Sequence, residues 1–380
     1  MIKIFLAGSP CTYWSISRQG RETIPSGIGW ELFENCLVAI DKFKPDIYLY
    51  ENNKSMAKAI RQEITTRFQR EQICINSSLV SAQHRERLYW TNIDGVEQPA
   101  DRGILLRDVL EPWGQVEKTY QLSEKALAYM ERRVRDGRNP SDFGHHNYGD
   151  ADKAHCITAN IYKTVPYNTL IQPVRIGTIE NNAKNTDHDS KQHRVYSPDA
   201  AAIRAECGGF GVGAKTGLYA TPHIGETPTG ITVYHVENGK IFVGENRYDI
   251  KADDGDYIIR KLTPTECEKL QTLPVGYTEG VSSTRRYQTI GNGWTAEVIK
   301  HILSFALDGV PRDEELLVLS LYDGISTGRY VLESMGFTNI KYHAYEIDPY
   351  AIQIAKKNYP DTIHHGDAFQ VRDDDWNTKE

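Results

Sequence analysis

The six cysteines of this 380-residue chain form no C-x-x-C pair and no other spacing typical of a zinc site. Scattered cysteines of this kind favour reduced thiols over a disulfide framework and indicate a reducing compartment. The pairs His145-His146 and His364-His365 also lack ligand spacing, so we expect no metal site. The cysteines are Cys11, Cys36, Cys74, Cys156, Cys207 and Cys267.

No apolar run approaches the ~20 residues that a membrane-spanning helix needs, and no basic segment followed by an apolar one opens the chain. We therefore expect a cytoplasmic protein without membrane contact. The formal net charge of −7 also lacks the basic excess typical of nucleic-acid binders. Nucleic acid stays open as a partner, because acidic residues on one face can leave a cleft basic.

The length suggests two domains at about 150 residues each, and the composition is that of a globular protein with ample core. Strand and helix patterns alternate over residues 1–93 and again over 316–380, which predicts an α/β fold with a doubly wound, mostly parallel, Rossmann-like sheet. Residues 94–258 are rich in Gly, Asn, His and Tyr and predict a smaller, loop-rich inserted domain. Residues 259–307 return to the main domain, and the polar residues 308–315 are interpreted as a linker.

The beginning of the chain predicts a candidate nucleophile. Residues 2–6 form a short apolar run typical of a buried strand, and Gly8, Ser9 and Pro10 end it. Cys11 is therefore expected at the carboxyl edge of the sheet, where ligands bind in open α/β folds. A thiol there becomes a nucleophile once its pKa is lowered, and a buried inert cysteine is the alternative.

Two further groups are expected at the same edge. Residues 46–50 predict a second buried strand that delivers Glu51, and the segment joining strands at 73–80 and 88–93 carries Arg85 and Arg87. Residues 12–29 predict a surface loop long enough to act as a mobile lid. Helices are predicted at residues 30–43, 56–64, 123–135, 264–274 and 295–307, and the last residues, 372–380, are expected to fray.

The carboxyl-terminal alternation predicts a nucleotide site. Strands at residues 316–321, 340–345 and 362–365 alternate with helices at 329–335 and 350–357. A glycine turn follows the first strand and Glu346 follows the second, where its carboxylate can accept hydrogen bonds from ribose hydroxyls. The turn lacks the full G-x-G-x-x-G spacing, which favours an adenosine-containing cofactor without a pyrophosphate.

A thiol, a carboxylate, an arginine pair and an adenosine site at one edge suit attack on an electron-poor ring. Cytosine fits, because a thiolate can add to its C6 while a protonated carboxyl group hydrogen-bonds N3, after which C5 attacks a methyl donor. Neither carbon is accessible in a stacked base, so the target must leave the duplex.

Together these stretches resemble the DNA (cytosine-5)-methyltransferases over the whole chain outside residues 94–257. Ser9-Pro10-Cys11 is similar to the family's Pro-Cys motif, Glu51-Asn52-Asn53 to its Glu-Asn-Val motif, and residues 83–87 to its Gln-x-Arg-x-Arg motif. Asn53 departs from the usual Val.

The later motifs follow in the second part of the chain. Residues 260–274 are similar to motif IX and Gly291-Asn292 to motif X. Residues 323–328 resemble motif I in the version found in animal de novo methyltransferases and many phage enzymes. Glu346 and Gly366-Asp367 resemble motifs II and III.

The resemblance implies a role for each matching residue, with S-adenosylmethionine as methyl donor and S-adenosylhomocysteine as product. Cys11 is the implied nucleophile, Glu51 binds N3 and the exocyclic amine, Arg87 contacts the base O2 or a phosphate, and Arg85 supports the pocket. The implied cofactor residues are Tyr322, Asp323, Gly324, Ile325, Thr327, Gly328, Glu346, Ile347, Asp367, Ala368, Asn292 and Trp294. The implied DNA contacts in the lid are Ser15, Ser17 and Arg18, and residues 94–258 become a target-recognition domain for double-stranded DNA.

The motif order departs from the family, because motifs I to III follow motif X across residues 308–315. This order indicates a circular permutation, and a homodimer that completes its fold by swapping is the alternative to a monomer. The rival functions are an N4-cytosine amino-methyltransferase and an inactive DNA-binding relative. We expect a bacterial or phage-infected cell as the setting, with restriction–modification, phage self-protection and regulation all open as roles.

Overall fold

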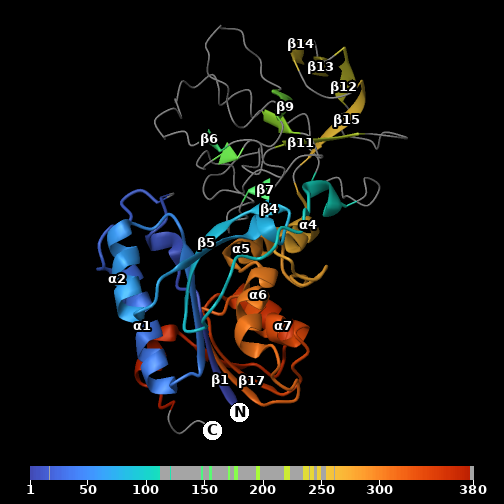
Figure 1. The fold of residues 1–380 in the computed structure, drawn as a ribbon. Coiled ribbons are helices and arrows are strands. Elements are labelled where there is room, and N and C mark those ends of the chain that lie inside the picture. Colours follow the sequence, from blue (N-terminus) through green and yellow to red (C-terminus); the bar gives the residue numbers. More distant parts are fainter. Residues whose placement is uncertain are drawn as a thin grey trace.

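The computed structural model describes residues 1–16, 18–111, 120 and 262–376, together with short strands between residues 147 and 260 (Figure 1). The predicted helix at 123–135 lies outside the described residues, as do Cys156, Cys207 and Ser17. Among the described residues, no helix combines the length and apolar character needed to cross a membrane.

A seven-stranded sheet forms the main domain. Its strands are β1 (Ile2–Ala7), β2 (Ile47–Asn53), β3 (Ile73–Asn76), β5 (Glu86–Thr91), β16 (Leu316–Leu321), β17 (Ile340–Tyr345) and β18 (Ile363–Gly366). Their order across the sheet is β18-β17-β16-β1-β2-β5-β3. All neighbours from β18 to β2 pair in parallel, and β5 runs antiparallel to both β2 and β3. The predicted mostly parallel, doubly wound sheet is confirmed.

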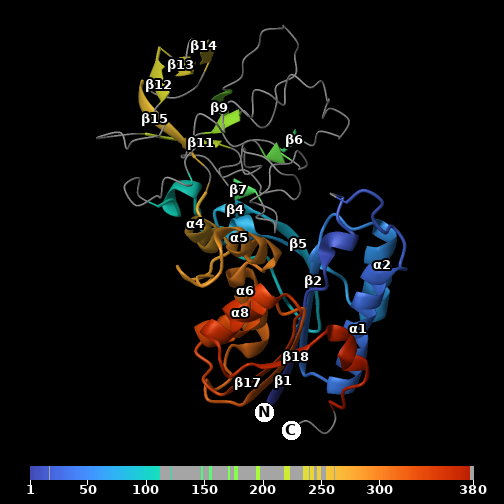
Figure 2. The ribbon, with the colours of Figure 1, turned by 180° about the vertical axis from the view of Figure 1, so that it is seen from behind.

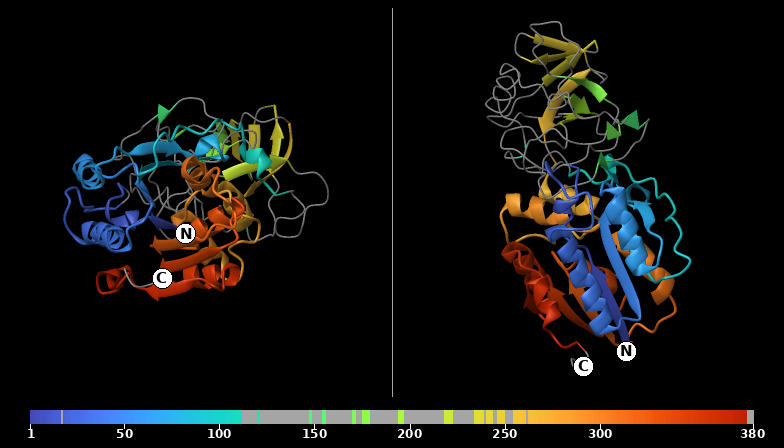
Figure 3. Two further views of the ribbon diagram at one scale, coloured as in Figure 1. Left: turned by 60° about the horizontal axis from the view of Figure 1, so that its bottom comes forward. Right: turned by 90° about the vertical axis from the view of Figure 1, so that its left-hand side faces the viewer.

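Helices cover both faces of this sheet, as Figures 1 and 2 show from opposite sides. The helices are α1 (Ile28–Phe43), α2 (Lys58–Phe68), α4 (Pro264–Leu270), α5 (Ser283–Asn292), α6 (Ala296–Leu307), α7 (Thr327–Ser334) and α8 (Pro349–Asn358). α1 and α2 pack on one face together with the 3-10 helix η7 (Ala368–Arg372), while α6, α7 and α8 pack on the other. In the right-hand view of Figure 3, the blue helices α1 and α2 lie in front of the sheet.

Burial on both faces explains the apolar strand sequences. In β1, Ile4 and Leu6 pack into the α6–α8 layer, whereas Phe5 and Ala7 pack into the α1–α2 layer. β16 alternates in the same way and is buried at every position. A strand covered on both sides needs apolar residues throughout, so its sequence is a continuous hydrophobic run.

At the centre of the sheet, the first strand of the chain pairs with the first strand of residues 316–380. β1 pairs with β16 from Ile2↔Leu316 to Ala7↔Leu321, so both strands end at the same edge. The loops that follow β1 and β16 therefore begin side by side. One chain supplies all seven strands, and no second copy is required to complete this sheet.

A second sheet lies beyond the carboxyl edge of the first (Figure 1). Its order is β14-β13-β12-β15-β11-β10-β9, and its pairs are antiparallel except for β10 with β11. The strands are β9 (Arg175–Thr178), β10 (Arg194–Tyr196), β11 (Leu218–Pro222), β12 (Tyr234–Glu237), β13 (Lys240–Val243), β14 (Asn246–Asp249) and β15 (Gly255–Arg260). They fall within the stretch 94–258 predicted to be an insertion, except that β15 continues to Arg260.

Several predicted boundaries are wrong. β2 continues through Asn53, and the strand expected at 73–80 stops at Asn76, where the 3-10 helix η2 (Ser77–Leu79) begins. Arg87 lies inside β5, and α5 was not predicted as a helix. The expectation that residues from 372 fray is wrong as far as Trp376, which is 1% exposed because its ring packs against Phe43 and His343.

Candidate active site

The segment after β1 places Cys11 at the carboxyl edge of the sheet, in the first turn of the 3-10 helix η1 (Cys11–Tyr13). Its backbone is held by β2, because Asn53 Nδ2 donates to the Cys11 carbonyl at 3.2 Å. Asn52 Nδ2 donates to the Ser9 carbonyl at 3.1 Å, and Ser9 Oγ lies 2.7 Å from Tyr50 OH. These contacts explain why polar residues 50–53 remain in a buried strand.

The surroundings of Cys11 act on its thiol in opposite directions. Burial raises the pKa of the Cys11 thiol, the Arg87 guanidinium lowers it, and the Glu51 carboxylate raises it again. The net pKa is raised, so the free protein holds Cys11 mainly as a thiol at neutral pH. An approaching electron-poor ring or a proton acceptor is needed to bring out its nucleophilic form.

Glu51, near the end of β2, accepts two bonds from separate parts of the chain. Arg87 Nε lies 2.9 Å from Glu51 Oε1, and Trp294 Nε1 donates to Glu51 Oε2 at 3.1 Å. Gly8 makes this approach possible, because a Cβ there would lie 2.9 Å from Trp294 Nε1. A thiol, a carboxylate, a guanidinium and an indole thus converge at one edge.

Arg85 and Gln83 are buried and bind protein groups. Arg85 Nη2 donates to the Gly293 carbonyl at 2.8 Å, and its guanidinium also reaches the Gly291 carbonyl. Gln83 Nε2 donates to the Leu270 carbonyl at 2.6 Å and to Gln271 Oε1 at 2.8 Å. These two side chains join the strand carrying Arg87 to the segment carrying Trp294. Gln271 was not singled out by the sequence analysis, and its side chain bonds Gln83 from one segment and the Ile290 carbonyl from another.

The first part of the predicted lid is anchored. Trp14 is fully buried, and its Nε1 donates to Glu22 Oε2 at 3.0 Å. Glu22 Oε1 also accepts a bond from the Gly29 backbone N–H at 3.1 Å. Beyond Trp14 the loop is solvent-accessible, and the Arg18 guanidinium stacks on the Tyr13 ring at 4.7 Å.

The loop after β16 and the first turn of α7 carry half of the predicted cofactor residues. Gly324 N donates to Glu346 Oε2 at 2.7 Å, and Glu346 Oε1 accepts bonds from the backbone N–H groups of Ile347 and Asp348, both at 2.8 Å. Burial raises the pKa of the Glu346 carboxyl group, while these backbone bonds lower it. Tyr322 OH donates to the Leu32 carbonyl at 2.8 Å, which fixes its ring beside α1.

The surface around this loop fits an adenosine-containing ligand. A Cβ at Gly324 would meet no atom within 4 Å, so the space over the loop is open. Ile347, next to Glu346, leaves 69% of its surface exposed and offers an apolar contact. Asp367 is exposed at the end of β18, where its Oδ1 accepts a bond from Phe369 N at 3.0 Å, and Ala368 is buried beneath it.

Trp294 lies between the residues around Glu51 and those at the start of α7. Its indole reaches Glu51 on one side, and its ring lies 3.8 Å from the position of a Cβ at Gly328 on the other. Gly328 and Thr327 are buried in the first turn of α7, and Ile325 packs near Gly293. Asn292, predicted beside Trp294, is exposed at the end of α5.

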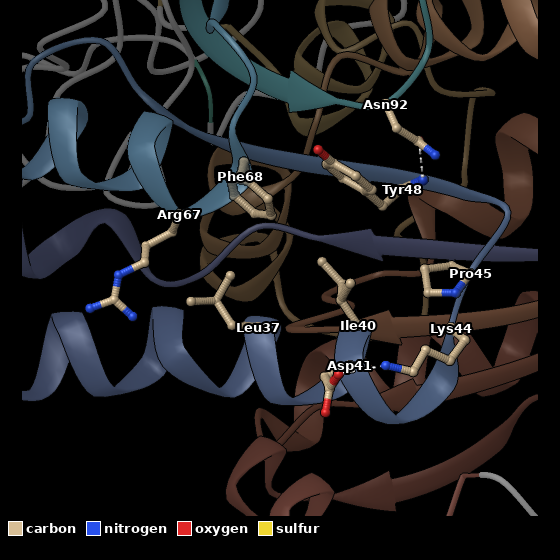
Figure 4. A pocket seen from close by; sticks show the side chains of 9 residues that line it. All are labelled: Leu37, Ile40, Asp41, Lys44, Pro45, Tyr48, Arg67, Phe68 and Asn92. Carbon is tan, nitrogen blue, oxygen red and sulfur yellow. Dashed lines mark hydrogen bonds and ion pairs between the residues drawn. The ribbon is translucent and has the colours of Figure 1, made fainter.

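A surface pocket between α1, β2 and α2 lies elsewhere (Figure 4). Lys44 and Pro45, which line it, precede β2, so the pocket opens toward the opposite edge of the sheet from Cys11. Its other lining residues are Leu37, Ile40, Asp41, Tyr48, Arg67, Phe68 and Asn92. Within the described part of the chain, no cluster of His, Cys, Asp and Glu could hold a metal ion.

Comparisons with known proteins give one family match and two partial likenesses. Residues 1–305 match the sequence profile of the family described as C-5 cytosine-specific DNA methylase. The DNA (cytosine-5)-methyltransferase DRM2 of Oryza sativa subsp. japonica is 31% identical over 96 residues, a match that spans 25% of this chain and only 14% of the relative. A solved structure of a DNMT2 mutant from Spodoptera frugiperda aligns with a TM-score of 0.39 and 15% identity, covering 80% of this chain and 78% of that chain.

Proposed function

We propose, from the premise that this chain belongs to the C-5 cytosine-specific DNA methylase family, that it methylates C5 of cytosine in double-stranded DNA. The observation that carries the proposal is the convergence of Cys11, Glu51 and Arg87 at the sheet edge from which the loop 322–328 also emerges. Trp294 lies between the two groups. Group transfer requires that the two substrates are held close together. A nucleophile and a nucleotide-binding loop on adjacent parallel strands place them so.

The proposed chemistry begins with Cys11. Its sulfur adds to C6 of a cytosine that has left the helix, forming an S–C bond, while the electron pair of the C5–C6 double bond moves into the ring toward N3. Glu51, in its protonated form, hydrogen-bonds N3 and the exocyclic amine and stabilises the resulting enamine. The Cys11 proton passes to water as the sulfur attacks. C5 then takes the methyl group as the methyl–sulfonium bond breaks and leaves a neutral thioether. The C5 proton passes to water, and Cys11 leaves C6 as a thiolate while the C5–C6 double bond re-forms.

Glu51 must exchange partners for this to happen. In the free protein both of its oxygens are engaged, one by Arg87 and one by Trp294. An incoming base replaces at least one of these contacts, and the released Arg87 guanidinium is then free to contact the base O2 or a phosphate. Arg85, bound to two backbone carbonyls, supports the pocket and does not contact the base.

The residues around the loop after β16 fit S-adenosylmethionine, whose sulfonium group supplies an electrophilic methyl. We assign the ribose hydroxyls to Glu346, the adenine faces to Tyr322 and Ile347, and the adenine amine to Asp367. Gly324, Ile325, Thr327 and Gly328 form the loop against the methionine portion. Asp323 and Ala368 support this site from beneath, and Asn292 and Trp294 border it.

The remaining assignments follow the same reasoning. Residues 94–258 are proposed as the target-recognition domain, and the exposed loop after Trp14, with Ser15, Ser17 and Arg18, as a lid over the DNA phosphates. Residues 1–93, 259–307 and 316–380 make up the catalytic domain, joined through the linker 308–315. The family profile ends at residue 305 while the sheet is completed by β16 to β18, which supports a circular permutation.

The setting is proposed on the sequence alone. Reduced cysteines favour the cytoplasm, and the form of motif I favours a bacterial or phage-infected cell, with a role such as restriction–modification. A monomer is proposed because one chain completes the sheet.

The decisive experiment uses duplex DNA that contains 5-fluorocytosine, together with S-adenosylmethionine. After methylation, fluorine cannot leave C5 as a cation, so the enzyme stays covalently attached through Cys11 and the complex survives denaturing electrophoresis. Cys11→Ser should bind DNA and cofactor normally but form no such complex. Methyl transfer without trapping would instead indicate an N4 amino-methyltransferase, and DNA binding without methyl transfer an inactive relative.

A further inference from the structure

The loop after β16 has an unusual backbone. Tyr322, Gly324 and Ser326 all adopt left-handed conformations, with φ values of 59°, 61° and 59°. This conformation is unfavourable for a residue with a side chain, so Tyr322 and Ser326 hold it only because neighbouring contacts enforce it. The contacts that do so determine whether the loop can receive a ligand.

The Asp323 carboxylate collects three hydroxyl groups beneath the loop. Ser320 Oγ and Tyr342 OH each donate to Asp323 Oδ1 at 2.7 Å, and Ser326 Oγ donates to Oδ2. Tyr342 belongs to β17, the neighbouring strand, and is 1% exposed. Burial raises the pKa of the Asp323 carboxyl group and the three hydroxyl donors lower it, so the donors favour its charged form.

A second tyrosine reaches the loop from another part of the chain. Tyr277, in the turn between α4 and α5, donates its hydroxyl to the Ile325 carbonyl at 2.7 Å and lies 3.3 Å from the Ser326 carbonyl. Its side chain is 5% exposed. Both tyrosines therefore meet the loop from its buried side, opposite the open space over Gly324.

We propose that Tyr277 and Tyr342 are positioning residues, whose hydroxyl groups hold the loop 322–326 in the shape that binds the cofactor. The inference rests on the proposed function, because the loop is assigned to S-adenosylmethionine there. Without either hydroxyl, the left-handed residues relax and a smaller fraction of molecules has a competent loop. The apparent dissociation constant rises by the inverse of that fraction.

The test titrates S-adenosylhomocysteine into the full chain by isothermal calorimetry. Tyr342→Phe removes a bond to a buried carboxylate and should weaken binding about 10-fold or more. Tyr277→Phe removes bonds to neutral carbonyls and should weaken it about 3- to 10-fold. Glu346→Ala, which removes a group assigned to the ribose, provides the reference for lost cofactor contact.

Tyr287→Phe is the matched control. Tyr287 is also a buried tyrosine, and its hydroxyl donates to the Leu262 carbonyl at 2.6 Å, away from the loop. The Tyr287→Phe variant also loses one buried hydroxyl group, and it should bind S-adenosylhomocysteine with wild-type affinity. Thermal unfolding of each variant verifies that it folds, and if Tyr342→Phe does not, Tyr277→Phe carries the test.

Steady-state kinetics separate positioning from general damage. Both loop variants should raise KM for S-adenosylmethionine, while KM for DNA and kcat at saturating cofactor stay near their wild-type values. A wild-type chain that does not bind S-adenosylhomocysteine would contradict the proposed function itself. Wild-type binding with both loop variants indistinguishable from Tyr287→Phe would overturn the positioning role and leave the function intact.

Discussion

At the scale of single residues, Cys11 is the position where burial and charge oppose each other most directly. Burial raises its pKa, the Arg87 guanidinium lowers it, and the Glu51 carboxylate raises it. Since only the thiolate is nucleophilic, a raised pKa means that reactivity increases with pH well past neutrality. The free protein thus keeps the Cys11 thiol largely protonated at neutral pH.

Alkylation of Cys11 by iodoacetamide, followed by mass spectrometry of its peptide, tests this balance. The rate should keep increasing up to about pH 9 or beyond, since thiolate accumulates only near the pKa. Arg87→Met should move the curve to higher pH because an attractive charge is lost. Glu51→Gln should move it to lower pH because a repulsive one is lost, and a rate that levels off below pH 8 in the wild type would contradict the raised pKa.

Gly8 offers a second test at this scale. A Cβ at Gly8 would lie 2.9 Å from Trp294 Nε1 and 3.2 Å from Glu51 Oε2. Gly8→Ala should displace the indole and lower the methyl-transfer rate about 10- to 100-fold, because small misplacements in a site are costly. In a Trp294→Phe background the alanine side chain at position 8 meets a smaller ring. The same substitution should therefore lower the methyl-transfer rate less. Equal losses in both backgrounds would exclude this contact as the cause.

At the scale of elements, α4 begins with a cap that also holds the start of the inserted stretch. Glu266 Oε2 accepts a bond from Thr263 N at 2.8 Å, while Glu266 Oε1 accepts one from Glu111 N at 2.8 Å. One buried carboxylate therefore joins the described chain at Glu111 to the start of α4. The cap is a reciprocal pair of Thr263 and Glu266, with Pro264 at the first helical position.

Glu266→Ala should lower the free energy of unfolding by about 2–4 kcal/mol, because it removes a cap and leaves two backbone N–H groups without their partner. Urea denaturation followed by circular dichroism measures the change. Glu297→Ala is the control, since Glu297 pairs with the half-exposed Arg102 and should cost less than about 1 kcal/mol. Comparable losses in the two variants would mean that the cap contributes nothing beyond a surface ion pair.

The elements also show what the sequence could and could not predict. β1 and β16 were predictable because strands covered on both faces are mostly apolar. The extension of β2 through Asn53 was not, because its polar residues are buried through bonds to groups on other segments, among them Ser9, Cys11 and Arg87. Local propensity cannot reveal a partner that is distant along the chain.

The same limit applies to the candidate site. Its residues were found from short motifs, yet their pairing was not predictable. Arg85 turns inward to the carbonyls of Gly291 and Gly293, and Trp294 reaches Glu51 from 243 positions away. Tyr277 and Tyr342 carried no motif at all, because their role depends on a loop to which they are not adjacent in sequence.

At the scale of the whole molecule, both ends of the described chain lie near one side chain. Lys3 Nζ is 5.5 Å from the centre of the Phe43 ring, and the Trp376 ring is 5.8 Å from the same ring. The segment 308–315, by contrast, joins α6 to β16 at the surface. This arrangement allows the chain order to be changed without changing the sheet.

A permuted variant, with residues 380 and 1 joined by a flexible Gly/Ser linker and new ends opened between Asp313 and Glu314, tests the point. It should keep the wild-type circular dichroism spectrum and bind S-adenosylhomocysteine with similar affinity. Opening the chain between Val318 and Leu319, inside β16, is the control and should prevent folding. If the variant opened between Asp313 and Glu314 is equally unfolded, residues 308–315 are themselves needed for folding.

The position of Trp294 has a thermodynamic consequence for the order in which ligands bind. One indole touches the carboxylate assigned to the base and borders the turn assigned to the methyl donor. If filling either place shifts that ring, the two occupancies are linked, and linkage is reciprocal. If bound DNA raises the affinity for the methyl donor by some factor, the bound donor must raise the affinity for DNA by the same factor.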